Sequence, residues 1–121
     1  MGDHRVHILV DAWTRDPTIL ERPDRVRDVL LQAAREAGAA VVGEQFHRFS
    51  PVGYTGCILL AESHIAVHSW VDEGLLTVDV FACRAEQSRA IVERLCADLG
   101  LERRRMIEVR RGEESDHVEK H

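Results

Sequence analysis

A strand-like apolar run that is broken in its middle dominates the sequence between residues 60 and 70. Apolar residues flank it on both sides, but Glu62, Ser63 and His64 follow one another directly near its start. Burying three polar groups inside a small β protein is costly unless they are paired or used in chemistry. From the residues alone, the favoured interpretation is a polar turn that joins two strands.

Segments typical of strands and of helices alternate along the chain. Apolar residues recur at three-and-four spacing after Pro23 and again after Gln87, which predicts two helices that end near Gly38 and Gly100. Strands are expected at residues 7–13, 40–49, 57–61, 65–70, 75–81 and 106–109, and helices at residues 23–37 and 87–99. This order predicts one α+β domain over residues 1–121, a two-layer sandwich of an antiparallel sheet with helices on one face.

One face of this expected sheet has no helix to cover it. The run from Cys57 to Ala61 is apolar at both alternating positions, so this strand is expected to be covered on both faces. Because two helices cover only one face, we expect self-association through the other, with two sheets stacking in a homodimer. The charged tail, residues 113–121, is expected to be frayed.

Composition narrows the class of protein. A net charge of −5 argues against a general nucleic-acid binder, and no apolar run approaches the roughly 20 residues that span a membrane. The N-terminus lacks the features of a signal peptide, so a cytoplasmic location is expected. The three cysteines are widely spaced and odd in number, which favours reduced thiols over a disulfide framework.

Seven histidines and three cysteines raise the question of a metal site. His64 and His68 would share one face of a helix, but the β-branched residues between them favour a strand. In a strand their Cα atoms would be roughly 13 Å apart, which is too far for one ion. No bound metal is therefore expected.

The polar tripeptide belongs to a longer pattern. Glu62-Ser63-His64 is followed by His68, Trp70 and Gly74, and then by Val-Asp-Val-Phe-Ala-Cys at residues 78–83. Together with Phe-His-Arg-Phe at residues 46–49, this pattern resembles the prokaryotic S-adenosylmethionine decarboxylase proenzymes, and the resemblance covers about residues 5 to 112. It implies conversion of S-adenosylmethionine to its decarboxylated form for spermidine and polyamine biosynthesis, by a homodimer that forms through stacking of sheets.

The resemblance implies that the chain cuts itself. The hydroxyl of Ser63 would attack the carbonyl of Glu62, β-elimination would break the resulting ester, and hydrolysis would leave a pyruvoyl group at residue 63. The products would be a β chain of residues 1–62 and an α chain of residues 63–121. The pyruvoyl cofactor would form a Schiff base with the substrate amine and accept the electrons released as carbon dioxide leaves.

Three further side chains receive catalytic roles from the resemblance. His68 matches a histidine that assists the elimination, and Thr55 matches a hydroxyl, usually serine in the family, that polarises the scissile carbonyl. Cys83 matches the proton donor to the substrate α-carbon, a task that suits a thiol with an ordinary pKa of about 8.5. Without the resemblance, Cys83 would be interpreted as a buried core thiol.

The substrate-binding residues that the resemblance implies are Phe49, Trp70, Asp72, Asp11 and Ile65. Phe49 and Trp70 match aromatic residues that sandwich the adenine ring. Asp72 falls where the family has a glutamate that hydrogen-bonds the ribose. Asp11 matches an acidic position near the site.

Several positions depart from the family pattern. Val71 replaces a proline, Ala66 replaces a serine or threonine, and Arg84 replaces a glycine. Because some lineages of the family are pyruvoyl-dependent arginine or ornithine decarboxylases, that activity stays open as an alternative. A non-catalytic small-molecule binding domain of similar topology is the more remote alternative.

The spacing of two catalytic candidates poses a geometric problem. In a straight strand, Ser63 and His68 would lie roughly 16 Å apart. The chain would have to bend or fold back near Ser63 for His68 to assist the cleavage.

Overall fold

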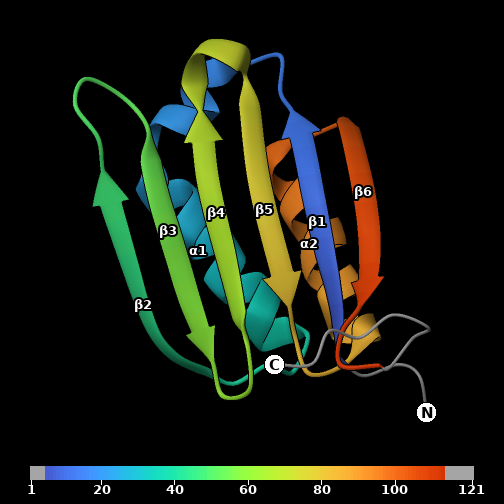
Figure 1. Ribbon diagram of the computed structural model, residues 1–121. Coiled ribbons are helices and arrows are strands. Elements are labelled where there is room, and N and C mark those ends of the chain that lie inside the picture. The colour runs from blue at the N-terminus through green and yellow to red at the C-terminus, as the bar shows by residue number, and fades with distance from the viewer. Residues whose placement is uncertain (1–4, 114–121) are drawn as a thin grey trace, which may run out of the picture.

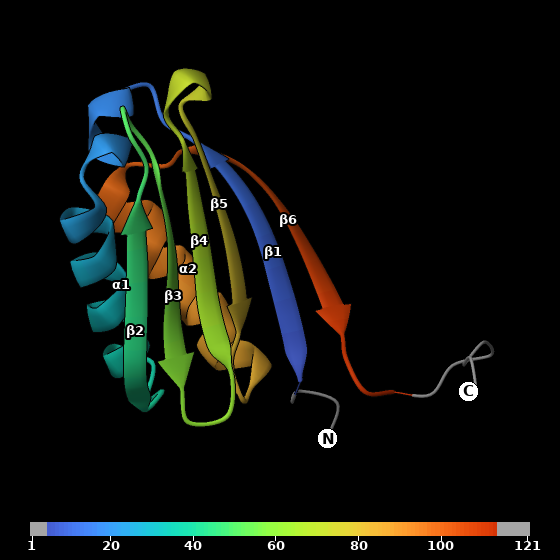
Figure 2. The ribbon, with the colours of Figure 1, turned by 60° about the vertical axis from the view of Figure 1, so that its left-hand side comes forward.

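A six-stranded antiparallel sheet with two helices on one of its faces forms the whole described structure (Figures 1 and 2). The computed structural model describes residues 5–113. The strands are β1 (Val6–Trp13), β2 (Val41–Arg48), β3 (Tyr54–Leu60), β4 (His64–Trp70), β5 (Leu75–Phe81) and β6 (Arg103–Arg110), in the spatial order β2-β3-β4-β5-β1-β6. The helices are α1 (Pro23–Glu36) and α2 (Ala85–Leu99), with short 3-10 helices at Pro17–Glu21 and Val71–Glu73. The predicted two-layer α+β fold is confirmed.

The two helices begin and end for local reasons. Pro23 occupies the first turn of α1, where its missing N–H costs no hydrogen bond. The helix ends before Gly38, whose φ of 85° lies in the left-handed region that terminates helices. Helix α2 begins at Ala85, two residues earlier than predicted, because the buried Ser88 hydroxyl accepts the Ala82 N–H at 3.1 Å and ties the first turn to the end of β5.

The hydrophobic core lies between the helices and one face of the sheet. Alternate residues of the central strands point into it, and α1 and α2 contribute their apolar faces. The largest fully buried side chains include Ile8, Leu30, Ile58, Ile65, Leu76, Ile91 and Leu95. Burial on this scale, at about 25 cal/mol per Å² of apolar surface, is what holds the two layers together.

The face of the sheet that points away from the helices, here called the open face, is covered by no helix or strand among residues 5–113 (Figure 2). Five large apolar side chains on it are more than one third exposed, namely Leu9, Leu59, Trp70, Ile107 and Val109. The strand at residues 57–61, expected to be covered on both faces, is covered on one face only within a single chain. Leu59 is accordingly 49% exposed.

The polar tripeptide forms the predicted turn. The Leu60 N–H donates to the Ser63 carbonyl at 2.9 Å, and the Ser63 N–H donates back to the Leu60 carbonyl at 3.3 Å. This pair of hydrogen bonds closes a two-residue loop, which places the 62–63 peptide bond at the tip of the β3–β4 hairpin. Glu62 is exposed and Ser63 is half-buried.

The opposite end of β4 turns through the Val71–Glu73 helix and Gly74 into β5. Gly74 has a φ of 62°, and a Cβ there would lie 2.9 Å from the Thr14 carbonyl oxygen. The Gly74 carbonyl also accepts the Thr14 N–H at 2.9 Å. Glycine is needed here for both backbone conformation and space. Within residues 5–113, no helix is long and apolar enough to cross a membrane.

Candidate active site

Side chains from neighbouring strands lie in register across the open face. Asp11 pairs with Thr77, Thr77 with His68, and His68 with Thr55, so four polar residues from β1, β5, β4 and β3 form one row. All four are half-buried. Because antiparallel partners on one face have adjacent Cβ atoms, polar groups that are far apart in sequence meet here.

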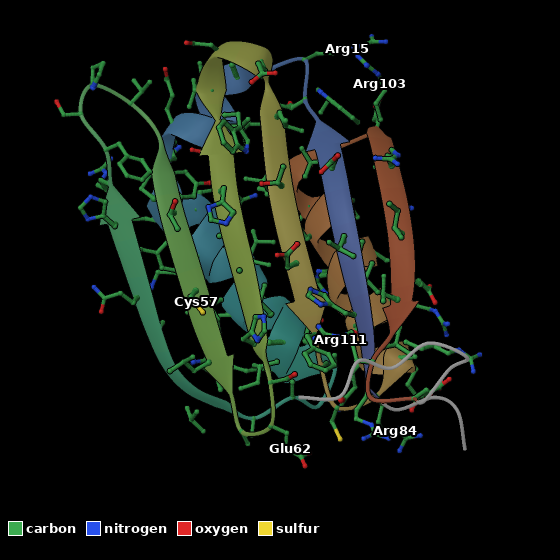
Figure 3. All side chains as sticks on the ribbon, viewed as in Figure 1. Arg15, Cys57, Glu62, Arg84, Arg103 and Arg111 are labelled. Carbon is green, nitrogen blue, oxygen red and sulfur yellow. The ribbon has the colours of Figure 1, made fainter. Side chains whose placement is uncertain are left out.

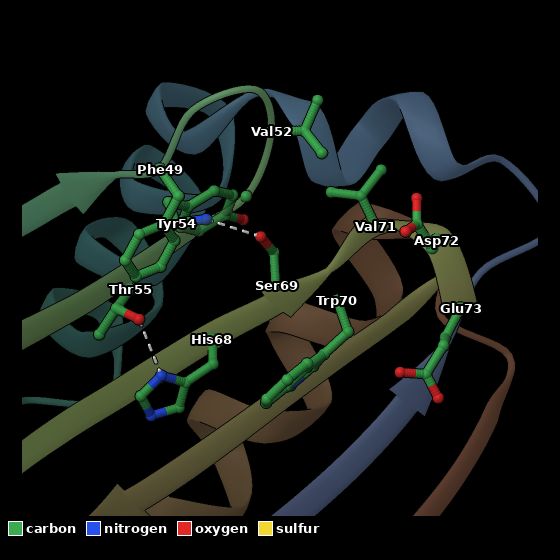
Figure 4. A pocket seen from close by; sticks show the side chains of 11 residues that line it. Phe49, Val52, Tyr54, Thr55, His68, Ser69, Trp70, Val71, Asp72 and Glu73 are labelled. Atoms are coloured by element: carbon green, nitrogen blue, oxygen red, sulfur yellow. Dashed lines mark hydrogen bonds between the residues drawn. The ribbon is translucent and has the colours of Figure 1, made fainter.

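Thr55 and His68 make direct contact in this row. The Thr55 Oγ1 and His68 Nδ1 atoms are 3.0 Å apart, as Figure 4 shows. The Thr77 hydroxyl lies on the other side of His68 and donates to the His68 backbone carbonyl at 3.4 Å. The contact with the Thr55 hydroxyl thereby orients the imidazole ring on the open face through its Nδ1 atom.

A pocket of about 430 Å³ lies next to this pair (Figure 4). Its lining consists of Phe49, Val52, Gly53, Tyr54, Thr55, His68, Ser69, Trp70, Val71, Asp72 and Glu73. The Phe49 and Trp70 side chains are each 49% exposed, so both present aromatic surface to a ligand. The Trp70 indole N–H donates to the Thr77 hydroxyl at 3.1 Å, which fixes the orientation of the ring.

The loop between β2 and β3 positions the second aromatic ring. The Phe49 N–H donates to the Gly53 carbonyl at 2.8 Å, and the loop contains a cis peptide bond before Pro51. Gly53 has a φ of 102°, a conformation that favours glycine. His47 packs edge-on against the Phe49 ring, with ring centroids 5.0 Å apart.

Acidic residues form one rim of the pocket. Asp72 and Glu73 both line it and both are exposed. Together with the aromatic walls, they make a site suited to a flat ring and to a polar or cationic group.

A second cluster lies at the other end of the open face, around the β3–β4 hairpin. His64 pairs with Phe81, so the start of β4 runs beside the end of β5, and Cys83 follows two residues later. The Glu62 carboxylate is the largest influence on the pKa of Cys83, and it raises that pKa. The Arg84 guanidinium acts in the opposite direction on the same pKa. Cys83 is exposed rather than buried in the core.

Aromatic and imidazole rings pack beside this second cluster. His7 stacks on Phe81 with centroids 5.4 Å apart, and His64 meets both rings edge-on at 6.0 Å. Arg111 lies over Phe81 at 5.6 Å and donates to His7 Nδ1 at 3.2 Å. Burial, the largest influence, lowers the pKa of His7. The sequence analysis did not assign His7 or Phe81 to the site, although their alternation with buried residues in β1 and β5 could have placed them on the open face.

The two clusters do not meet within one chain. Strand β4 is continuous from His64 to Trp70, and the chain folds back at residue 63 onto β3 rather than toward His68. His68 therefore lies opposite Thr55, roughly 16 Å along the strand from Ser63. The structure brings Thr55, His68, Phe49, Trp70 and Asp72 together at one end, and Glu62, Ser63 and Cys83 at the other.

Two expected substrate-binding residues lie apart from the pocket lining. Ile65 has no exposed surface and packs in the core on the helix-facing side of β4. Asp11 lies on the open face in the same row as His68, but one strand, β5, separates them. Within residues 5–113, no three His, Cys, Asp or Glu residues are grouped so that they could hold a metal ion.

Comparisons with known proteins agree with this geometry. A family model described as S-adenosylmethionine decarboxylase matches residues 6–112. The S-adenosylmethionine decarboxylase proenzyme of Thermococcus gammatolerans is 37% identical over 112 residues, which cover 91% of this chain and 78% of the relative. The S-adenosylmethionine decarboxylase proenzyme of Pyrococcus abyssi is 33% identical over 112 residues, which cover 91% of this chain and 80% of that relative.

A solved structure has the same fold. The crystal structure of the adenosylmethionine decarboxylase from Aquifex aeolicus superposes with a TM-score of 0.85 at 28% identity, covering 99% of this chain and all of the other. The match of the family model over nearly the whole chain, with relatives above 30% identity, settles the family. The chain belongs to the S-adenosylmethionine decarboxylase family.

Proposed function

We propose that this chain is a self-processing proenzyme that decarboxylates S-adenosylmethionine. Its family makes it a decarboxylase, a carboxy-lyase. The observation that carries the choice of substrate is the pocket between Phe49 and Trp70, whose two aromatic faces suit an adenine ring. Stacking of a base on an aromatic side chain contributes about 1–3 kcal/mol. The side chain of Asp72 at the rim supplies an acceptor for a ribose hydroxyl.

The alternative substrates make less use of these residues. Ornithine has no flat group to place against the aromatic rings, and the planar guanidinium of arginine is smaller than adenine and would cover less of them. The acidic rim formed by Asp72 and Glu73 does not distinguish the candidates, because it suits their cationic groups as well as a ribose. The aromatic pair therefore decides the proposal in favour of S-adenosylmethionine.

Ser63 is the proposed precursor of a pyruvoyl group. Its surroundings fit such a group: it lies half-buried in a tight turn, at the end of the sheet where β5 leads to the exposed thiol of Cys83. The Ser63 hydroxyl would attack the Glu62 carbonyl and convert the peptide bond to an ester. Loss of the Ser63 α-proton breaks the Cβ–O bond and leaves a carboxylate on Glu62. Water then replaces the nitrogen of residue 63, which departs as ammonia.

When formed, the pyruvoyl group supplies an electron sink for the decarboxylation. The remaining work falls to the side chains of the protein. Phe49 and Trp70 bind the adenine, and Asp72 orients the ribose. Cys83 delivers the proton that replaces the lost carboxylate at the substrate α-carbon. Thr55 and His68 polarise the carbonyl and move the proton during self-cleavage.

We propose that these two groups of side chains are joined by a second copy of the chain. Stacking of two open faces would cover the exposed Leu9, Leu59 and Ile107. If the copies are related by a two-fold axis that lies between the sheets, perpendicular to the strands, the strands run in opposite directions. The Thr55–His68 end of one copy then lies over the Ser63–Cys83 end of the other. This arrangement offers an answer to the distance of roughly 16 Å within one chain.

Intact-mass spectrometry and carbon dioxide release test the proposal together. The purified protein should contain two polypeptides, residues 1–62 and 63–121, and the Ser63→Ala variant should remain a single chain. Carbon dioxide release should be measured with S-adenosylmethionine, arginine and ornithine side by side. An uncut wild-type chain after prolonged incubation would overturn the enzymatic proposal. Turnover of arginine or ornithine without S-adenosylmethionine would overturn only the substrate.

A further inference from the structure

A guanidinium group is held on the open face at the Ser63 end of the sheet. The Arg111 side chain lies over the Phe81 ring, with its Cζ atom 5.6 Å from the ring centroid, and it donates to His7 Nδ1 at 3.2 Å. Figure 3 shows Arg111 beside the end of β5, toward the same end of the sheet as Glu62. An aromatic ring and an imidazole therefore fix the position of this guanidinium.

The rings that Arg111 contacts pack against the residue that follows Ser63. His7 pairs with Phe81 and Phe81 pairs with His64, so these three residues form one row across β1, β5 and β4. The His64 ring meets the other two rings edge-on, with centroids 6.0 Å apart in both cases. Because His64 directly follows Ser63, this row connects Arg111 to the position of the proposed pyruvoyl group.

Arg111 has no carboxylate partner among residues 5–113, and both of its side-chain contacts, with His7 and Phe81, are with groups that carry no negative charge. The neighbouring Arg110, by contrast, pairs with Glu113 at 3.8 Å. A guanidinium has five N–H donors in a planar fork that matches a carboxylate, and the contact with His7 uses one of them. The exposed Arg111 side chain is thus suited to bind a carboxylate of another molecule.

The His7 ring is committed to this contact. Its Nε2 atom is buried and has no hydrogen-bond partner among residues 5–113, so the ring makes its one hydrogen bond there with Arg111. Burial, the largest influence, lowers the pKa of His7; Arg111 and His64 act in the same direction, whereas Asp79 opposes them. The imidazole is therefore neutral near pH 7, which leaves Nδ1 able to accept from the guanidinium.

The proposed substrate contains a carboxylate that still lacks a binding residue. In the proposed function, Phe49 and Trp70 bind the adenine and Asp72 orients the ribose. The amine of the substrate reacts at residue 63. The α-carboxylate is attached to the carbon that carries this amine, so it must lie near residue 63 as well. Removing a carboxylate from water is costly unless a cation or hydrogen-bond donors receive it.

We propose that Arg111 binds the α-carboxylate of the substrate, and that His7 is a positioning residue that holds the guanidinium for this contact. The inference rests on the proposed function and deepens it, because it gives the amino acid end of the substrate a subsite. The carboxylate leaves as neutral carbon dioxide, so the ion pair is strongest before the bond breaks. Arg111 therefore contributes to substrate binding rather than to the rate of bond breaking.

Binding of S-adenosylmethionine and of its decarboxylated form tests the proposal, because the two ligands differ only at the carboxylate. Isothermal titration calorimetry with the uncut Ser63→Ala chain measures both without turnover. Arg111→Gln should weaken binding of S-adenosylmethionine by about 10- to 100-fold, the usual effect of losing hydrogen bonds to a charged group, and should leave binding of the decarboxylated form unchanged. Arg111→Lys keeps the charge but loses the fork, so it should weaken binding less.

The role of His7 requires two variants. His7→Phe keeps a ring to stack on Phe81 but removes the acceptor, and it should weaken binding of S-adenosylmethionine alone. His7→Asn, whose amide oxygen can take the place of Nδ1, should retain most of the affinity. Arg110→Gln is the matched control: Arg110 pairs with the buried Val6, so its side chain lies on the helix-facing side of β6, and its removal should change neither affinity. Circular dichroism establishes that each variant is folded.

Kinetics of the cleaved enzyme provide a second measurement. Arg111→Gln should raise the KM for S-adenosylmethionine by about the factor measured for binding, while kcat changes by less than about threefold. Inhibition by the decarboxylated form should be unchanged. If the uncut chain binds neither ligand, this comparison of KM with the inhibition constant decides the question.

Equal weakening of both ligands by Arg111→Gln would show that the residue shapes the site without binding the carboxylate, and it would overturn the inference. Unchanged binding of both ligands would overturn it as well. Failure of the proposed function has a different signature, because the wild-type chain would then stay uncut or release no carbon dioxide from S-adenosylmethionine.

Discussion

The Oγ1 atom of Thr55 and the Nδ1 atom of His68 lie 3.0 Å apart on directly opposed residues of β3 and β4. Thirteen residues separate them in sequence, and the hairpin at residue 63 brings them together. A hydroxyl held against an imidazole is suited to polarising a carbonyl or passing a proton. We therefore expect the Thr55 hydroxyl to contribute to self-cleavage.

Thr55→Val keeps the shape of the side chain and removes its hydroxyl, whereas Thr55→Ser keeps the hydroxyl. If the hydroxyl polarises the scissile carbonyl, Thr55→Val should slow self-cleavage by about 100-fold, the usual effect of removing one such donor. Thr55→Ser should cleave at nearly the wild-type rate. The appearance of the two fragments on a denaturing gel measures both rates. Equal rates for the valine variant and the wild type would exclude this role of Thr55.

Complementation tests whether the active site is shared between two chains. Ser63→Ala and His68→Ala should each remain uncut when expressed alone. In a mixed dimer, one of the two sites would combine the intact Ser63 of one chain with the intact His68 of the other. Co-expression should therefore yield cleaved chains, all carrying the His68→Ala substitution, which mass spectrometry identifies. Absence of any cleavage in a verified mixed dimer would argue for a site built within one chain.

His7 should make stability depend on pH. Burial lowers the pKa of His7 below its ordinary value of 6.5, so the unfolded chain binds this proton more readily than the folded chain. The stabilisation is therefore present above about pH 6.5 and is lost as the pH falls below it. Urea unfolding of the uncut Ser63→Ala chain, at fixed protein concentration, measures the slope.

His7→Gln in that background should flatten the slope between about pH 7 and pH 5. Arg111→Gln, which removes a cation that lowers the pKa of His7, should flatten it in part. Identical slopes in all three proteins would show that His7 does not contribute.

The hydroxyl of Tyr54 is buried and receives no hydrogen bond from any of residues 5–113. Its side chain is 1% exposed, its OH has no hydrogen-bond partner among the described residues, and burial raises its pKa. An unpaired buried hydroxyl costs free energy that a hydrocarbon of the same shape does not. Tyr54→Phe should therefore raise the free energy of unfolding by about 1 kcal/mol, as measured by urea unfolding. A loss of stability would mean that the hydroxyl has a partner in solution.

The Phe46 ring leaves no space for a side chain at Gly56. A Cβ at this position would collide with the Phe46 side chain, which packs across Gly56 on the helix-facing side of the sheet. Gly56→Ala should lower the free energy of unfolding by about 1–3 kcal/mol, the usual cost of overpacking. Gly43→Ala on β2, where the nearest atom would be 3.4 Å away, is the matched control. If both variants are equally stable, the Phe46 ring moves freely.

The sequence predicted the fold well because its patterns are local. Alternation in β1 and β5 and the three-and-four spacing in α1 indicate which face of each element is buried. The early start of α2 could not be predicted, because it depends on the Ser88 hydroxyl meeting the Ala82 N–H across the strand end. The exposure of Leu59 likewise depends on how many helices cover the sheet, which apolar alternation does not reveal.

The sequence named candidate residues for the site, but it did not predict which of them lie close together in the structure. The spacing of Ser63 and His68 suggested a bend, whereas β4 is continuous and the two lie apart. Which residues meet across the hairpin depends on the loop length at residues 61–62, and the position of Cys83 beside this hairpin depends on the pairing of β4 with β5. Register of this kind is a tertiary property, which residue spacing alone does not specify.

The strand order β2-β3-β4-β5-β1-β6 has a consequence for the order of events in time. A cut between residues 62 and 63 would leave β1, β2 and β3 in one fragment and β4, β5 and β6 in the other. Strand β1 of the first fragment would then remain hydrogen-bonded between β5 and β6 of the second fragment. The uncut chain can assemble this sheet in a unimolecular reaction, so we expect the sheet to form before the cut. After denaturation, the two fragments of the cleaved protein would have to associate by diffusion before the sheet could form again. The yield of refolded protein should therefore fall as the protein is diluted, whereas the yield for the uncut chain should not.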